Sequence, residues 1–282
     1  MPAPALYVVA TPIGNLADIT QRALDTLSQV DVIACEDTRR SRVLASHYGI
    51  PTPMIAYHDH SEARVTEQLL ERLHKGQAIA LISDAGTPLI ADPGYKLVNN
   101  VREAGFPVIP VPGVSALTAA LSAAGMPTDR FVFEGFLPAK REARCKKLQE
   151  LHDEPRTIVV YESSHRIVSA CEDLLAVFGE QRCIVLAREL TKQFETFLSG
   201  TAPELLARLS EDPNQCRGEF VLIIEGAAAP EQGAAQQQAD AMLAVLLEEV
   251  SVKQAAKLAS KLLGQKKNFL YDRALALSQA AK

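Results

Sequence analysis

Short apolar runs alternate with amphipathic segments along the first half of the chain. The apolar runs cover 6–10, 30–34, 54–57, 78–82 and 108–111, and helical patterns lie between them at 22–28, 39–48, 62–74 and 95–103. Gly49 and Gly76 stand where glycines commonly end helices. This rhythm predicts a parallel β-sheet with crossover helices, in which the loops after the strands meet along one edge.

A second series of apolar runs begins near residue 131. Strands are predicted at 131–136, 157–161, 183–187, 196–198 and 220–225, and helices at 140–151, 166–178 and 203–209. Thr201 and Glu204 have the spacing of a capping box at the start of the last helix. We therefore expect an α/β protein with two α/β domains, 1–126 and 127–226, joined near Gly125.

The C-terminal part of the chain changes in composition. Residues 227–238 are rich in Ala, Gln and Gly and predict a linker, and residues 239–282 predict a small helical appendage with helices at 239–249, 251–263 and 268–277. Residues 251–282 hold seven basic residues and one acidic residue, a net charge of +6, whereas residues 1–250 carry −11. Lys253, Lys257 and Lys261 share one helical stripe, which is either a solvated face or a nucleic-acid contact.

The composition describes a globular chain, with 48% hydrophobic and 22% charged residues. The first residues lack the pattern of a secretory signal, and no apolar run approaches the roughly 18 residues of a membrane span. The five cysteines are scattered without a C-x-x-C pair, and the histidines show no metal-ligand spacing. These features predict a cytoplasmic protein with no disulfide framework, no membrane association and no metal site.

Four segments that follow predicted strands are rich in Gly, Pro and small polar residues. They begin at Thr11, Glu36, Ser83 and Pro110, and the third of them is the turn SDAGTP. Glycine lets a ligand approach the backbone, and helix N-termini behind such loops offer N–H groups to an anion. Four such loops on one sheet edge predict a small-molecule site there. The phosphate loop and the dinucleotide-binding glycine fingerprint are both absent, which argues against a dinucleotide-dependent oxidoreductase.

Charged residues also cluster after two strands of the second domain, at 161–166 and 187–192, and suggest the far wall of a cleft. With these residues the chain resembles the tetrapyrrole methylase superfamily, the class III S-adenosylmethionine methyltransferases, and within it the small-subunit ribosomal RNA methyltransferase I group. The motifs that carry the resemblance are LYVVATPIGN at 6–15, EDTR at 36–39, SDAGTP at 83–88, PGVSA at 112–116, GFLP at 135–138, YE at 161–162, RELTK at 188–192 and GEF at 218–220. The first loop and the SDAGTP turn depart from the glycine-rich loop and Gly-Asp-Pro turn of the tetrapyrrole-modifying enzymes, which favours the RNA group.

The resemblance implies two α/β domains with S-adenosylmethionine in the cleft between them, a homodimer, and methyl transfer to the ribose 2′-hydroxyl of a cytidine in the decoding region of small-subunit (16S) rRNA, either as RNA or in the assembled 30S subunit. The residues to which it assigns cofactor contact are Pro12, Asp84, Ala85, Gly86, Ile90, Ser115, Tyr161, Arg188 and Phe220. A methylase of a tetrapyrrole precursor and a non-enzymatic RNA-binding module remain alternatives.

A poor nucleophile such as a hydroxyl calls for a base, and several carboxylates are candidates. They are Glu36, Asp37, Glu162 and Glu189. An acidic protein that binds RNA needs local positive surface. The candidate RNA contacts are Arg39, Lys140, Arg141, Arg144, Lys192, Lys253, Lys257, Lys261 and Lys266.

Overall fold

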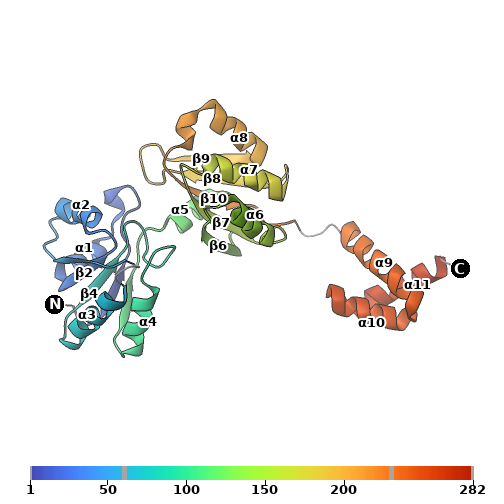
Figure 1. Ribbon diagram of the computed structural model, residues 1–282, viewed down its shortest axis with the longest axis horizontal. Helices are drawn as coiled ribbons and strands as arrows, with labels where there is room; N and C mark the ends of the chain where they lie inside the picture. The colour runs from blue at the N-terminus through green and yellow to red at the C-terminus, as the bar shows by residue number, and fades with distance from the viewer. Residues whose placement is uncertain (1, 59–61, 229–231, 281–282) are drawn as a thin grey trace. The chain divides into compact units, whose positions relative to one another are not determined.

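The computed structural model describes residues 2–58, 62–228 and 232–280. The chain divides into two compact units, Met1–Gly226 and Ala227–Lys282, and the larger unit contains two lobes, each built on its own sheet (Figure 1). No helix in the described part of the chain is long and apolar enough to cross a membrane.

The first lobe holds a five-stranded sheet in the order β3-β2-β4-β1-β5, with every neighbouring pair parallel. Its strands are β1 (Leu6–Val9), β2 (Val32–Cys35), β3 (Met54–Ala56), β4 (Ile79–Ile82) and β5 (Val108–Val111), and its helices are η1 (Leu16–Asp18), α1 (Gln21–Gln29), α2 (Thr38–Tyr48), α3 (Glu62–His74) and α4 (Tyr95–Glu103). Since all strands run the same way, the loops after them leave from one edge, as the alternating pattern predicts.

Helices cover both faces of this first sheet. Ile33 and Ala80 pack with Leu27 of α1 and Leu44 of α2 on one side. On the other side, the strand residues that alternate with them pack against α3 and α4. Strands buried on both faces read as continuous apolar runs, which is why the sequence shows them so clearly.

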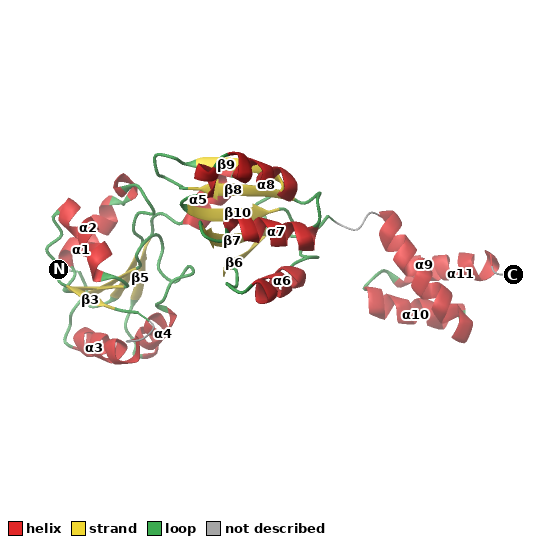
Figure 2. Cartoon of the chain, turned by 45° about the horizontal axis from the view of Figure 1, so that its top comes forward, coloured by secondary structure: helices red, strands yellow, loops and turns green. Residues whose placement is uncertain are grey.

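The second lobe holds a mixed sheet in the order β6-β7-β10-β8-β9, in which only the β6–β7 pair is parallel. Its strands are β6 (Phe131–Phe136), β7 (Thr157–Ser163), β8 (Cys183–Arg188), β9 (Thr196–Thr201) and β10 (Glu219–Ile224), and its helices are α6 (Arg141–Glu150), α7 (Ile167–Phe178), α8 (Ala202–Glu211) and η2 (Pro213–Cys216). Residues of α6, α7 and α8 form one core with this sheet, and Figure 2 shows the strands beside these helices. The predicted capping box of Thr201 and Glu204 is present at the start of α8.

The opposite face of the second sheet is covered by α5 (Ala116–Ala123), a helix that the sequence pattern did not reveal. Ala120 and Leu121 of α5 pack against Val159, Val185 and Val221. The sequence assigned residues up to 126 to the first domain, but this helix packs on the sheet of the second lobe. It is built from Ala, Leu, Thr and Ser alone, so it shows no charged face by which a helix could be recognised.

The smaller unit is a bundle of α9 (Gln232–Glu249), α10 (Val252–Leu263) and α11 (Lys267–Ala280). Helix α9 begins at Gln232, so the predicted 227–238 linker is partly helical, and its residues 229–231 lie outside the described residues. Leu243, Ala255 and Leu270 belong to a separate core of this unit. A capping box of Ser251 and Gln254 starts α10, and the helix ends at Gly264, which has a φ of 67°. The basic stripe of α10 is exposed, opposite the buried alanines of the helix.

Candidate active site

A pocket of about 450 Å³ lies at the edge of the first sheet where the strands end, and residues of the second lobe complete its wall. The first lobe contributes Ile13 after β1, Glu36 and Arg40 after β2, 84–87 and 90–92 after β4, and Ser115 and Ala116 after β5. The second lobe contributes Phe136, 161–164, Leu190 and 218–221. The four loops singled out in the sequence therefore do line one pocket.

The turn after β4 is tied to the loops that follow β1 and β5. Thr11 and Gly86 exchange two backbone hydrogen bonds, of 2.8 and 3.0 Å, and the hydroxyl of Thr87 donates to the carbonyl oxygen of Val114. Gly86 has a φ of 81°, and a Cβ there would lie 3.3 Å from Ile13. A side chain at this position would therefore meet both backbone strain and a crowded neighbour.

Asp84 uses both of its carboxylate oxygens on the start of α2. Oδ1 accepts from the backbone N–H of Asp37 at 3.0 Å, and Oδ2 accepts from Arg40 at 2.9 Å. The carboxylate that the sequence assigned to the cofactor thus also fixes the neighbouring loop. Asp37 itself accepts two side-chain hydrogen bonds from Arg39, which lower its pKa to about 2.

The segment after this turn has an unusual backbone. Leu89 and Ala91 both have positive φ, at 71° and 65°, and Ile90 between them lines the pocket. Such conformations cost free energy in residues other than glycine and are concentrated at functional sites. The next residue, Asp92, also lines the pocket. Burial raises the pKa of its carboxyl and the Asp84 carboxylate raises it further, against a hydrogen bond from Ser83. The sequence reasoning did not single out Asp92, although it stands in the Asp-Pro-Gly run that continues the loop.

Tyr161 on β7 connects the second sheet to the start of α5 at the pocket. Its phenolic oxygen accepts a hydrogen bond from the backbone N–H of Leu117, and burial raises its pKa. Phe220 on β10 lines the same wall. Seven of the nine predicted cofactor residues therefore line the pocket. They are Asp84, Ala85, Gly86, Ile90, Ser115, Tyr161 and Phe220.

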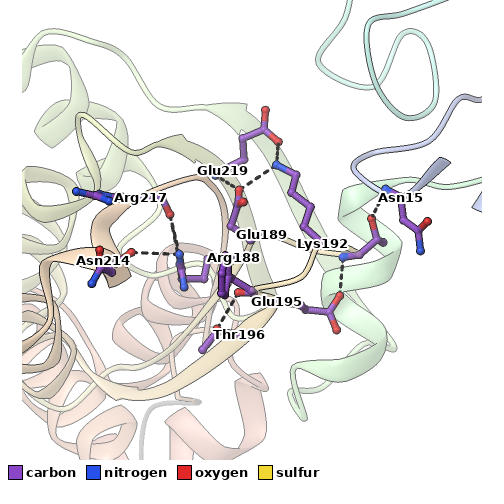
Figure 3. Close-up of polar contacts among 11 residues, drawn as sticks. Asn15, Arg188, Glu189, Lys192, Glu195, Thr196, Asn214, Arg217 and Glu219 are labelled. Carbon is purple, nitrogen blue, oxygen red and sulfur yellow. Dashed lines mark hydrogen bonds and ion pairs between the residues drawn. The ribbon is translucent and has the colours of Figure 1, made fainter. Parts of the chain in front are cut away.

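The other two, Pro12 and Arg188, lie elsewhere. Pro12 lines a smaller neighbouring pocket of about 120 Å³. The guanidinium of Arg188 is buried and donates to the carbonyl oxygens of Asn214 and Arg217, as Figure 3 shows. In this structure it therefore organises the segment before β10 instead of facing the pocket.

Glu162 is buried against the start of α7. Oε1 accepts from Arg166 at 2.7 Å and from the backbone N–H of Ser163, whereas Oε2 is buried and has no hydrogen-bond partner among the described residues. The side chain is 0% exposed, so a proton on a bound substrate has no direct route to it. Of the predicted base candidates, Glu162 is therefore suited to holding Arg166, whose Nη1 also donates to the carbonyl oxygen of Leu137.

Lys192 lies between two carboxylates, as Figure 3 shows, and one of them, Glu219, lines the pocket. Its ammonium donates to Glu189 and to Glu219, each at 2.9 Å. Burial alone would raise the pKa of Glu189, but the hydrogen bonds from Lys192 and from the backbone N–H of Glu219 lower it. A paired lysine and a paired glutamate are both less available for the RNA contact and the base role that the sequence assigned to them.

The stem of Lys192 covers the glycine of the first loop. A Cβ on Gly14 would overlap Cγ of Lys192. The next residue, Asn15, donates its backbone N–H to the hydroxyl of Thr191 at 3.2 Å. Glu189 and Thr191 have positive φ, so the second lobe also uses a strained segment where it meets the first.

The basic residues near α6 fall into two kinds. Lys140 is exposed, and Arg141 is 75% exposed although it donates to Asp173. Arg144 is buried, with 4% of its side chain exposed, and binds Asp173 at 2.7 Å. The structure corrects the prediction for Arg144, because a side chain enclosed in this way is not accessible to a phosphate. Within the described residues there is also no cluster of His, Cys, Asp and Glu that could hold a metal ion.

Comparison with known proteins places this geometry in a family. Residues 5–206 match the model of the Tetrapyrrole (Corrin/Porphyrin) Methylases, and residues 233–278 match that of the RsmI C-terminal HTH domain. The chain belongs to the tetrapyrrole methylase family. Within this family it is 54% identical over 272 residues to ribosomal RNA small subunit methyltransferase I of Haemophilus influenzae, with 96% of each chain covered. It is 50% identical over 276 residues to the protein of the same name from Pseudomonas aeruginosa, with 98% of each covered.

Solved structures of tetrapyrrole methylases have the same fold at low identity. The cobalt precorrin-4 methyltransferase of cobalamin biosynthesis matches with a TM-score of 0.60 and 18% identity, over 79% of this chain and 95% of that one. Uroporphyrin-III C-methyltransferase of Thermus thermophilus, complexed with S-adenyl homocysteine, matches with a TM-score of 0.54 and 20% identity, over 78% and 97%. These matches confirm the predicted α/β fold, and the helices α9–α11, which hold the match to the RsmI C-terminal HTH domain, confirm the helical appendage.

Proposed function

We propose that this protein transfers a methyl group from S-adenosylmethionine to the ribose 2′-hydroxyl of a cytidine in the decoding region of small-subunit rRNA. The observation that carries the proposal is the pocket at the strand ends. It is lined by both lobes, in a chain about half identical, over nearly its whole length, to proteins named ribosomal RNA small subunit methyltransferase I.

The pocket fits the proposed cofactor in size and charge. A volume of about 450 Å³ lies within the range of small-molecule sites, roughly 300–1,000 Å³. Five of the lining residues are acidic, namely Glu36, Asp84, Asp92, Glu162 and Glu219, of which Glu162 is enclosed and paired with Arg166. A negative lining favours a cation such as a sulfonium over a neutral ligand. The turn at 84–86 with Ile90, Ser115, Tyr161 and Phe220 would hold the cofactor.

When bound, S-adenosylmethionine supplies an electrophilic methyl group on a positively charged sulfur. The residues of the chain must orient the acceptor hydroxyl and accept its proton. Orientation contributes on the order of 7–11 kcal/mol at best, and a positioned base about 10²–10⁴-fold in rate. Of the carboxylates, Asp37 with a pKa of about 2 and the paired Glu189 are weak bases. Glu36 and Asp92, which both line the pocket, are the base candidates that we propose.

We propose that two separate exposed groups of lysines and arginines, one in each unit, contact the RNA. Lys253, Lys257, Lys261 and Lys266 belong to the smaller unit, and Lys140 and Arg141 to the start of α6. Such residues bind the phosphate backbone without sequence preference and make affinity depend on salt. We further propose that the active form is a homodimer and that the substrate is the 30S subunit, whose folded rRNA offers a defined shape for binding.

Methylation assays separate this function from its alternatives. The purified protein is incubated with methyl-labelled S-adenosylmethionine and either 30S subunits, free 16S rRNA or uroporphyrinogen III, and the labelled product is mapped. We expect a single 2′-O-methylcytidine in 16S rRNA, which is also absent from cells that lack the protein. Label in the tetrapyrrole would support the small-molecule alternative. RNA binding with no calorimetric signal for S-adenosylmethionine would support a non-enzymatic module.

A further inference from the structure

Arg40 differs from the other residues that line the pocket. Among the described lining residues it alone is basic, and five others are acidic. An acidic lining suits a cationic cofactor, but it repels the phosphate groups of a nucleic acid strand. A strand whose ribose has to reach this pocket therefore needs a positive group beside the entrance.

The guanidinium of Arg40 is held on one side and open on the other. Nη1 donates to Oδ2 of Asp84 at 2.9 Å, and 72% of the side chain is exposed. Arg40 also lines the smaller pocket next to the main one, so it lies where the two adjoin. Asp84 is itself fixed by the backbone N–H of Asp37, which limits the positions that the guanidinium can take.

The neighbouring Arg39, to which the sequence assigned RNA contact, is arranged differently. Its Nε and Nη2 both bind the carboxylate of Asp37, the residue that caps α2, and it does not line the pocket. Basic residues in the first turn of a helix oppose the helix dipole. The carboxylate of Asp37 offsets this unfavourable interaction for Arg39, and the carboxylate of Asp84 offsets it for Arg40.

We propose that Arg40 binds the phosphodiester group adjacent to the ribose that enters the pocket, and that Asp84 positions it for this contact. The proposal rests on the rRNA methyl transfer proposed above. An arginine is suited to the role because its planar fork can bind two phosphate oxygens at once. Because Asp84 belongs to the cofactor turn, this contact also connects RNA binding to the part of the pocket that holds the cofactor.

The test compares variants of three arginines of α2: Arg40→Ala, Arg40→Lys, Arg39→Ala and Arg42→Ala. Arg42 is exposed on the same helix and does not line the pocket, so it is the matched control. Methyl transfer is measured with saturating S-adenosylmethionine and increasing 30S subunits at several salt concentrations, and cofactor affinity by calorimetry.

We expect Arg40→Ala to raise KM for the subunit about 10-fold and to reduce the slope of log affinity against log salt concentration by about one. Arg40→Lys should fall between Arg40→Ala and the unmodified protein. Cofactor Kd should stay within about twofold in all variants, and Arg42→Ala should be unchanged.

Two results would overturn the proposal while the unmodified protein still methylates rRNA. One is an equal rise of KM in Arg40→Ala and Arg39→Ala. The other is a loss of cofactor affinity in Arg40→Ala as large as its loss of activity, which would mean that Arg40 acts on the cofactor through Asp84. If the unmodified protein fails to methylate rRNA at all, the proposed function fails instead. Thermal melting of each variant shows whether it is folded.

Discussion

The phenolic oxygen of Tyr161, near the end of β7, accepts a hydrogen bond of 3.0 Å from the backbone N–H of Leu117 in the first turn of α5. Tyr161 and the residue before this helix, Ser115, both line the pocket. The ring of Tyr161 packs edge-on against Phe133 and Phe136 of β6. One side chain thus connects β7 to the start of α5, the helix that follows the last strand of the first sheet.

Replacing Tyr161 with Phe tests this connection. The Leu117 N–H then loses its partner in a partly buried place, which costs about 1–3 kcal/mol. We expect a lower melting temperature and a several-fold weaker affinity for S-adenosylmethionine by calorimetry. Tyr48→Phe is the control. The Tyr48 hydroxyl donates a hydrogen bond of 2.7 Å to the carbonyl oxygen of Leu16, and Tyr48 lies outside the main pocket. It should lose stability but keep cofactor affinity; an equal loss of affinity in both variants would contradict a local role for Tyr161.

Gly14→Ala should disturb the contact between the first loop and Lys192. The added methyl group would overlap Cγ of Lys192, so either the lysine or the loop must move. We expect lower stability and slower methyl transfer. In a Lys192→Ala background the same substitution should cost at least about 1 kcal/mol less, as contacting residues show in double-mutant cycles. Additive effects on unfolding would mean that the crowding at Gly14 has another source.

Asp92→Asn should make the protein more stable at neutral pH and less active. Burial and the Asp84 carboxylate raise the pKa of Asp92 in the folded state, so its ionisation opposes folding. The contribution of Asp92 to the free energy of unfolding is greatest below the unfolded pKa of about 3.9, and it is lost as pH rises through the raised pKa of the folded state. The melting temperature of Asp92→Asn, relative to the unmodified protein, should therefore rise with pH over this window. A pH-independent difference would exclude this origin.

Arg144→Ala should unfold the second lobe more easily without a specific effect on RNA. Removal of Arg144 leaves Asp173, which is 1% exposed, without its closest partner. Breaking a buried pair in this way costs about 3–5 kcal/mol. At a temperature where the variant is folded, its KM for the 30S subunit should match that of the unmodified protein. Lys140→Ala, at an exposed position beside it, should show the converse, with normal melting and a weaker salt dependence of RNA binding.

Charge reversal along α10 tests the smaller unit. With Lys253, Lys257 and Lys261 all changed to Glu, RNA affinity should fall steeply and the slope of affinity against salt should lose about three units. Cofactor affinity should not change. Lys75→Glu, at an exposed lysine that follows α3, serves as the control for a single charge reversal outside α10. Unchanged RNA binding and salt dependence in the triple variant would show that this helix face is only solvated.

Most of the fold follows from local patterns that the sequence displays directly. Buried parallel strands appear as apolar runs, and the capping boxes at Thr201 and Ser251 mark real helix starts. The convergence of four loops on one pocket follows from parallel topology, because only then do all the strand ends meet. Helix α5 was missed, since a helix with no charged face has no periodic signal, and α9 begins inside a segment whose composition is typical of linkers.

Side-chain roles were less predictable than the position of the site. Arg39 and Arg40 are adjacent and identical in type, and only the positions of Asp37 and Asp84 determine which of them faces the pocket. Arg144 belongs to a basic run, yet a buried aspartate 29 positions later in the chain removes it from the surface. These outcomes depend on contacts between segments distant in sequence, which no local pattern encodes.

The position of α5 also determines how the molecule could be taken apart. A cut at the sequence boundary near residue 126 would leave α5 on the N-terminal fragment and expose Val159, Val185 and Val221 on the other. A cut before Ala116 would keep the helix with the sheet it covers. Chimaeras that exchange lobes between relatives should therefore cross over at 112–115, and the exchanged piece would then carry the Leu117 N–H together with its tyrosine partner.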